Sequence, residues 1–222
     1  MFCIPIIASN TEEAISKMDI AARLGDVLEV RLDLMGSFDI HRIIKAATKP
    51  VLITCRSVRE GGMGKDSPEA VSAHLISAIE SGANLVDVEL SMPRNLRERV
   101  LDAGDKTEII ISTHINKGTP SNSELEKIFR ESTAAGGDII KIVTMARDWE
   151  DNLRILELVN RAKNEGVKII SFCMGPLGMM SRVFSVLMGA YMTFASLETG
   201  QESAKGQIPI DRMKEITGFF AA

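Results

Sequence analysis

The sequence predicts a single (β/α)8 barrel, and three observations favour this fold. Short runs of apolar and β-branched residues alternate with longer amphipathic stretches along the whole chain. Eight such runs occur in 222 residues, at about 25 residues per unit, which is the repeat typical of this barrel. No linker, low-complexity segment or break in composition divides the chain. We therefore expect one domain that spans residues 1–222.

Each expected strand is a short run in which apolar residues, many of them β-branched, predominate. In chain order the strands are Phe2–Ile7, Val27–Leu32, Val51–Arg56, Leu85–Glu89, Glu108–Ser112, Ile139–Val143, Lys168–Phe172 and Tyr191–Ala195.

The stretches between the strands carry signals for helix starts and stops. Ser9–Glu13 offers a capping residue followed by acidic residues, and Ser67-Pro68-Glu69 places proline in the first turn of a helix. Thr119–Glu124 leads into a further helix. Four glycines just before a strand are expected to end helices in the left-handed conformation, namely Gly25, Gly82, Gly136 and Gly166.

A doubly wound open sheet is the alternative architecture. That fold would normally use fewer strands, and it would offer a glycine-rich turn after the first strand. Here the turn is Ala8-Ser9-Asn10, without a G-x-G-x-x-G motif. The barrel is therefore the better interpretation.

Charge and hydropathy exclude several classes of partner. The net charge of -4 is spread along the chain, and no basic run of five or more residues occurs, which argues against nucleic acid and anionic membranes. The N-terminus lacks the positive region of a signal peptide. The longest uncharged run, Val183–Leu197, is too short for the ~20 residues of a membrane-spanning helix. We expect a small molecule as the ligand.

Cysteine and histidine usage bears on compartment and on metals. The three cysteines lack C-x-x-C spacing and lie in apolar runs, which is typical of a reducing cytoplasm. The three histidines show no H-x-H or H-x-x-x-H spacing, so no metal site is expected.

Lys141 is the most informative single residue. It lies in the middle of a strand, between β-branched apolar residues, where an ammonium group is costly to bury. Burial favours the neutral amine, which is the nucleophile that forms a Schiff base with a ketone. Taken alone, however, Lys141 could instead lie at a strand end or pair with a carboxylate.

Polar residues stand at the ends of seven of the eight strands. In a barrel of this type the carboxyl ends of the strands form the active site, so these side chains should meet in one cavity. Strand periodicity places Glu29, Arg31 and Asp33 on one face, as it does Asp87 and Glu89. So many charges are not buried without a ligand or a network that satisfies them.

The order and spacing of these residues resemble type I 3-dehydroquinate dehydratase over nearly the whole chain. The motifs that carry the resemblance are Glu29-x-Arg31-x-Asp33, Thr54-x-Arg56-x3-Glu60-Gly61-Gly62, Asp87-x-Glu89, Ser112-x-His114, Lys141-Ile142, Ser181-Arg182 and Ser203-Ala204-x-Gly206-Gln207.

The resemblance implies dehydration of 3-dehydroquinate to 3-dehydroshikimate, the third step of the shikimate pathway, without a metal or organic cofactor. By the same resemblance, Lys141 would form the Schiff base. His114 would act as general base and then general acid, and Glu60 would orient its imidazole. A homodimer is also implied, with Val183–Tyr191 and Phe219-Phe220 serving either an interface or the outer core.

The resemblance assigns the remaining site residues to binding and support. Arg182 would pair with the substrate carboxylate, helped by Ser203 and Gln207 on a closing loop. Glu29, Arg31 and Arg56 would hold the ring hydroxyls. Three further residues would lie around them: Asp87 and Glu89 as charge partners of Arg31, Arg56 and Lys141, and Met174 as an apolar wall.

The chain departs from the common family pattern at three places. The departures are Ile115-Asn116, Phe172 and Lys205, none of which is a proton-transfer or imine-forming position.

Two other functions are the alternatives to this interpretation. Another Schiff-base barrel, such as a class I aldolase or transaldolase, would need a phosphate cradle near the last two strands. A non-catalytic binding barrel would have been expected to lose Lys141, His114 or Glu60.

Overall fold

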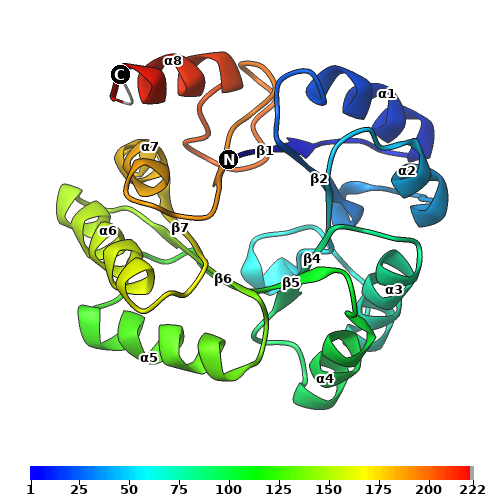
Figure 1. The fold of residues 1–222 in the computed structure, drawn as a ribbon, viewed down its shortest axis with the longest axis horizontal. Helices are drawn as coiled ribbons and strands as arrows, with labels where there is room; N and C mark the ends of the chain where they lie inside the picture. The colour runs from blue at the N-terminus through cyan, green and yellow to red at the C-terminus, as the bar shows by residue number, and fades with distance from the viewer. Residues whose placement is uncertain (221–222) are drawn as a thin grey trace.

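Eight parallel strands form a nearly closed barrel, and eight α-helices surround it in chain order (Figure 1). This computed structural model describes residues 1–220. The strands are β1 Phe2–Ile6, β2 Val27–Arg31, β3 Val51–Thr54, β4 Leu85–Glu89, β5 Glu108–Ile115, β6 Ile139–Met145, β7 Ile169–Met174 and β8 Thr193–Phe194. The helices are α1 Thr11–Ala21, α2 Ile40–Ala46, α3 Pro68–Glu80, α4 Arg94–Ala103, α5 Asn122–Ala134, α6 Trp149–Asn164, α7 Met179–Leu187 and α8 Ile210–Phe220, with short 3-10 turns at Leu32–Leu34 and Val58–Glu60.

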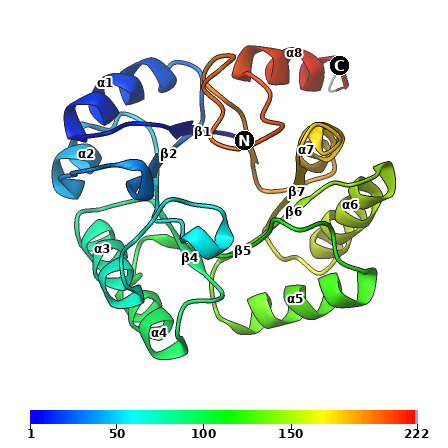
Figure 2. The same ribbon diagram turned by 180° about the vertical axis from the view of Figure 1, so that it is seen from behind.

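The hydrogen-bonded strand order β7-β6-β5-β4-β3-β2-β1-β8 places the barrel's seam between β7 and β8. At the seam the N–H of Tyr191 donates to the carbonyl of Ile169 over 2.7 Å. The expected strand Tyr191–Ala195 is therefore too long, since only Thr193 and Phe194 pair with β1. Seen from behind, the same ring of helices encloses the strands (Figure 2).

Most of the expected helix boundaries are confirmed. The side chains of Asn10 and Ser67 cap α1 and α3, and Ser121 forms a capping box with Glu124 at the start of α5. Gly82, Gly136 and Gly166 adopt the left-handed conformation.

The prediction for Gly25 is wrong, because α1 ends earlier and Gly25 is not left-handed. Gly25 instead passes close to β1, where an added Cβ would lie 3.0 Å from the side chain of Ile4.

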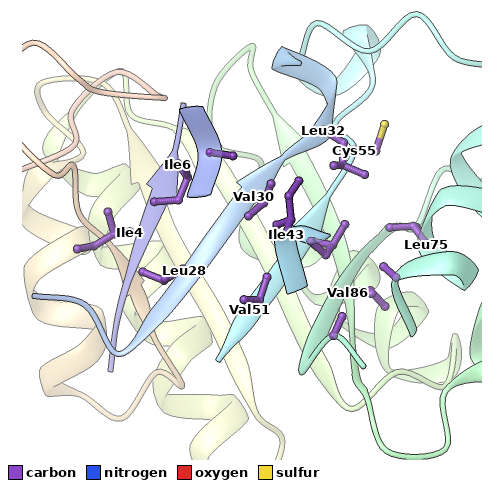
Figure 3. Close-up of a cluster of buried hydrophobic side chains, with 14 of the residues drawn as sticks. Ile4, Ile6, Leu28, Val30, Leu32, Ile43, Val51, Cys55, Leu75 and Val86 are labelled. Carbon is purple, nitrogen blue, oxygen red and sulfur yellow. The ribbon is translucent and has the colours of Figure 1, made fainter. Parts of the chain in front are cut away.

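The outward-facing side chains of the strands pack against the helices. In Figure 3, Ile4, Ile6, Leu28 and Val30 belong to such a cluster, together with Leu75 of α3. Within the described residues, no helix is long and apolar enough to cross a membrane.

Along β2 to β6 the inside of the barrel changes from apolar to polar, whereas the inward-facing residues of β7 and β8 stay apolar. The amino ends supply an apolar floor made of Cys3, Val27, Leu52, Leu85, Ile110, Ile139, Ile170 and Met192. Because successive inward-facing residues are two apart, the next layer holds Glu29, Thr54, Asp87, Ser112 and Lys141, all of them buried. The fold therefore seals one end of the barrel and gathers polar groups at the other.

Candidate active site

A cavity opens at the carboxyl ends of the strands and contains most of the residues predicted from the sequence. Its lining includes Lys141, His114, Glu60, Glu29, Arg31, Arg56, Arg182, Ser203, Gln207 and Met174. Asp87 and Glu89 do not line it; they lie against its cations. Larger grooves lie elsewhere, such as one of about 310 Å³ between α5 and α6, but there Arg161 is exposed and pairs with both Glu126 and Glu165.

Lys141 lies at the bottom of this cavity and is 3% exposed. Its Nζ donates to Oδ2 of Asp87 over 2.9 Å, lies 3.7 Å from Oε1 of Glu29, and is 4.4 Å from the centre of the Phe194 ring. The sequence left open whether Lys141 is shaped by burial or pairs with a carboxylate, and in the structure two carboxylates lie beside it. Asp87 and Glu29 stabilise a positive charge at this position.

Arg56 is buried among three carboxylates. It forms ion pairs with Asp87 at 2.7 Å and Glu89 at 3.0 Å, and it lies 3.5 Å from Glu60. Burial disfavours the charged guanidinium, but these carboxylates outweigh burial and raise the pKa of Arg56. Burial would likewise raise the pKa of Asp87, but Arg56 and Lys141 hold it well below its usual range. Asp87 is therefore the shared anion between the two cations.

The ion-pair partner of Arg31 is Asp33, which differs from the partners predicted from the sequence. Its Nε and Nη2 each donate to a carboxylate oxygen of Asp33 over 2.7 Å. The prediction that Asp87 and Glu89 pair with Arg31 is therefore wrong, because Asp33, two residues along, offers bidentate geometry. The predicted pairing of Asp87 with Arg56 and Lys141, and of Glu89 with Arg56, is confirmed.

His114 and Glu60 form a close pair at the cavity wall. Nδ1 of His114 lies 3.2 Å from Oε2 of Glu60, which also accepts the His114 backbone N–H over 3.0 Å. Burial, and then the cations Arg56 and Lys141, lower the pKa of His114 well below its usual value. Burial and the nearby Glu89 raise the pKa of Glu60 to about 7. A neutral imidazole whose Nδ1 proton faces Glu60 leaves Nε2 free to accept a proton.

Arg182 is a buried cation without an anionic partner among the described residues. Its guanidinium stacks 4.2 Å from the Phe172 ring centre, and its Nη2 lies 3.4 Å from the carbonyl of Lys205. Its Nε and Nη1 have no hydrogen-bond partner within residues 1–220. Burial lowers its pKa to about 9. Such an arrangement is costly until an anion enters the cavity.

The loop between β8 and α8 closes one side of the cavity. The backbone N–H of Ser203 donates to Oε1 of Gln207 over 2.8 Å, and Nε2 of Gln207 donates to Oγ of Ser203 over 3.0 Å. Gly206 has a φ of 79° and lies so close to the turn after β7 that an added Cβ would be 2.2 Å from the carbonyl oxygen of Gly175. Only glycine fits this contact.

The structure adds residues whose roles the sequence did not predict. Phe194 and Val143 line the cavity, and Asn116 and Phe172, noted only as departures, line it as well. The two-residue periodicity of the strands could have indicated Phe194 and Val143. Ser91 also donates a hydrogen bond to Glu60 from a neighbouring loop, a contact that no sequence pattern indicates.

Comparisons with known proteins agree with this geometry. The family model described as Type I 3-dehydroquinase matches residues 2–221. The chain belongs to this family. A relative from Methanocaldococcus jannaschii, named 3-dehydroquinate dehydratase, is 38% identical over 219 residues, which cover 97% of each chain.

Solved structures of the family have the same fold. The 3-dehydroquinate dehydratase of Geobacillus kaustophilus superposes with a TM-score of 0.88 at 28% identity, covering 99% of this chain and 90% of that one. The Clostridium difficile type I enzyme, described with covalent modified comenic acid, superposes with a TM-score of 0.87 at 26% identity, covering 99% and 91%. The family resemblance predicted from the motifs is thus confirmed.

Proposed function

We propose that this chain dehydrates 3-dehydroquinate to 3-dehydroshikimate through a Schiff base on Lys141. The observation that carries the proposal is the convergence on one cavity of a buried lysine, a histidine–carboxylate pair and an unpartnered arginine. These are the groups that elimination next to a ketone requires: an electron sink, a proton carrier and an anchor for the substrate carboxylate.

Arg182 anchors the substrate in this proposal. The substrate carboxylate supplies the anion that the buried guanidinium lacks, and Nε and Nη1 are the unused donors that face it. Ser203 and Gln207 add polar groups from the β8–α8 loop. The resulting pair fixes one end of the ring, so that the ketone lies toward Lys141.

Lys141 then acts as the nucleophile. Its amine attacks the ketone carbon, water is lost, and the protonated imine that forms withdraws electrons from the adjacent carbon better than the ketone did. Asp87 and Glu29 stabilise the positive charge on this nitrogen. The covalent modification described for the Clostridium difficile relative supports a covalent route.

His114 moves the proton. Its free Nε2 accepts the proton from the carbon next to the imine, and the electron pair passes into the imine to give an enamine. The enamine expels the β-hydroxyl group, which His114 protonates so that it leaves as water. Hydrolysis of the remaining imine releases the product and restores Lys141. Glu60 holds the ring by accepting from Nδ1.

The remaining lining residues position the ring. Glu29, Arg31 and Arg56 offer acceptors and donors to its hydroxyl groups, and Met174 supplies an apolar wall. The reaction proposed here takes its electron sink from the lysine, so it uses no metal or organic cofactor.

Borohydride trapping tests the Schiff base directly. Reduction in the presence of 3-dehydroquinate should attach one ligand at Lys141, because reduction converts the imine into a stable amine. Intact-mass measurement followed by peptide mapping locates the adduct. The Lys141→Met variant, treated identically, should carry none.

Two results would contradict this proposal. One is labelling at a different lysine, or no adduct in an enzyme that turns over. The other is equal trapping of a phosphorylated ketose, which would indicate a class I aldolase instead.

We further propose a homodimer, because α8 exposes apolar side chains. Phe219 is 82% exposed, Ile216 and Phe220 are also exposed, and the ring of Phe220 lies beside that of Phe184 of α7. Patches of this kind are typical of contact surfaces.

We also propose that the protein works in a reducing cytoplasm, because its three cysteines are free and buried.

A further inference from the structure

We propose that Ser91 is a positioning residue for the Glu60–His114 pair. This inference rests on the proposed function, since it concerns the proton-transferring histidine. Ser91 does not line the substrate cavity; it belongs to the loop between β4 and α4.

The Ser91 hydroxyl fixes the orientation of the Glu60 carboxylate. It donates to Oε1 of Glu60 over 2.8 Å, while Oε2 accepts from the backbone of His114 and faces its Nδ1. One carboxylate oxygen of Glu60 therefore binds Ser91, and the other binds His114. Without Ser91, Oε1 would keep no hydrogen-bond donor among the described residues, and the carboxylate could rotate away from the ring.

The backbone around Ser91 is held on both sides. The N–H of Leu90 donates to the carbonyl of Ser112 over 2.8 Å, and that of Met92 donates to the carbonyl of Glu89 over 3.0 Å. Nη1 of Arg97 donates to the carbonyls of Leu90 and Met92, which flank Ser91. These bonds fix the backbone from which the Ser91 hydroxyl reaches Glu60.

Ser91 also lies between this pair and the solvent-exposed surface of the protein. It is exposed, and it lines an outer hollow of about 600 Å³ that reaches Glu60 and His114 from the side of the barrel wall. The same hydroxyl lies 3.4 Å from Oε2 of Glu89, the carboxylate that helps to raise the pKa of Glu60. The hydrogen bond from Ser91 acts in the opposite direction and favours the charged form of Glu60.

Ser91→Ala should lower kcat about tenfold with KM changed less than twofold, because a hydrogen bond to a charged group is lost while the substrate contacts remain. The acid limb of the kcat profile should move to higher pH, since the Glu60 carboxylate loses a donor. Ser91→Thr, which keeps the hydroxyl, should restore both properties. Arg94→Ala, an exposed change three residues further along, is the matched control and should leave them unchanged.

A second readout does not depend on turnover. The chain has three histidines, so the ring signals of His114 can be followed by NMR as the pH is varied. In Ser91→Ala, the step that reports Glu60 ionisation should occur at higher pH than in the unaltered protein.

Folded Ser91→Ala with an unchanged pH profile and an unchanged His114 titration would overturn the inference, as would a rate loss that Ser91→Thr does not rescue. Failure of the unaltered enzyme to dehydrate 3-dehydroquinate would refute the proposed function instead, and the NMR titration would still decide the role of Ser91.

Discussion

The three buried cations of the cavity face very different surroundings. Arg56 and Lys141 share Asp87, and further carboxylates lie beside each. Arg182 has an aromatic ring and one carbonyl oxygen beside it. Carboxylates therefore stabilise the charges of Arg56 and Lys141 already in the free protein. The charge of Arg182 gains such a partner only when an anion binds.

Replacement of Arg182 should stabilise the free protein and weaken binding. We expect Arg182→Met to raise the free energy of unfolding by about 1–3 kcal/mol, since a buried charge without a partner is removed. Denaturant unfolding with and without 3-dehydroquinate measures both effects. The ligand should stabilise the unaltered protein much more than the variant.

The exposed replacement Arg99→Met is the control, and it should change neither quantity. A destabilised Arg182→Met protein that still gains full stability from the ligand would contradict this interpretation.

Replacement of His114 should separate imine formation from proton transfer. His114→Ala should lower the rate by at least ~10²–10⁴-fold, the usual contribution of one proton transfer. Lys141 remains nucleophilic, so the variant should accumulate a covalent adduct that intact-mass measurement detects without borohydride. A histidine with only a structural role would lower stability and spare the rate per folded molecule. Near-normal turnover in a folded variant would move the role to Glu60.

At the scale of elements, strand periodicity was the main basis for predicting which side chains face the inside of the barrel. Because alternate residues of a strand face inward, the polar layer could be expected once the eight strands were recognised. The length of β8 could not, because it depends on pairing with β1 and on the seam beside β7. His114 was expected just after a strand, but β5 continues to Ile115 because β6 pairs with it up to that residue.

Ion-pair partners were the less predictable part of the site. Asp87 and Glu89 were expected near the cations, but whether Arg31 pairs with them or with Asp33 is decided by side-chain geometry in the folded barrel. The contact between Ser91 and Glu60 joins the β4–α4 loop to the short 3-10 turn after β3, and contacts between such connecting segments leave no periodic signal.

The β8–α8 loop offers a test at this scale. Gly206→Ala should raise KM several-fold, because the added Cβ would meet the carbonyl oxygen of Gly175 and displace Ser203 and Gln207. Gly200→Ala in the same loop is the matched control: its φ of 86° imposes similar strain, but nothing lies within 4 Å of its added Cβ. Steady-state kinetics of both variants would decide. Equal KM values would show that the close approach at Gly206 does not position the loop.

At the scale of the whole molecule, the exposed aromatic end of α8 predicts association. Phe219→Glu should convert a dimer to a monomer in sedimentation velocity, because a charge would be buried at the contact. Lys214→Glu places the same charge on another face of α8 and should leave the dimer intact. A monomeric unaltered protein would remove the basis for this interface.

The carboxylates around Lys141 also bear on how the positively charged stages of the catalytic cycle are stabilised. A protonated imine carries the same single positive charge as the ammonium group that it replaces, at the same nitrogen. Asp87 and Glu29, the two acids beside that nitrogen, would therefore meet an equivalent cation when Lys141 carries its proton and again in the protonated imine, whereas the attacking amine and the enamine are neutral. The same two carboxylates would therefore serve both cationic stages from the positions that they hold in the free protein.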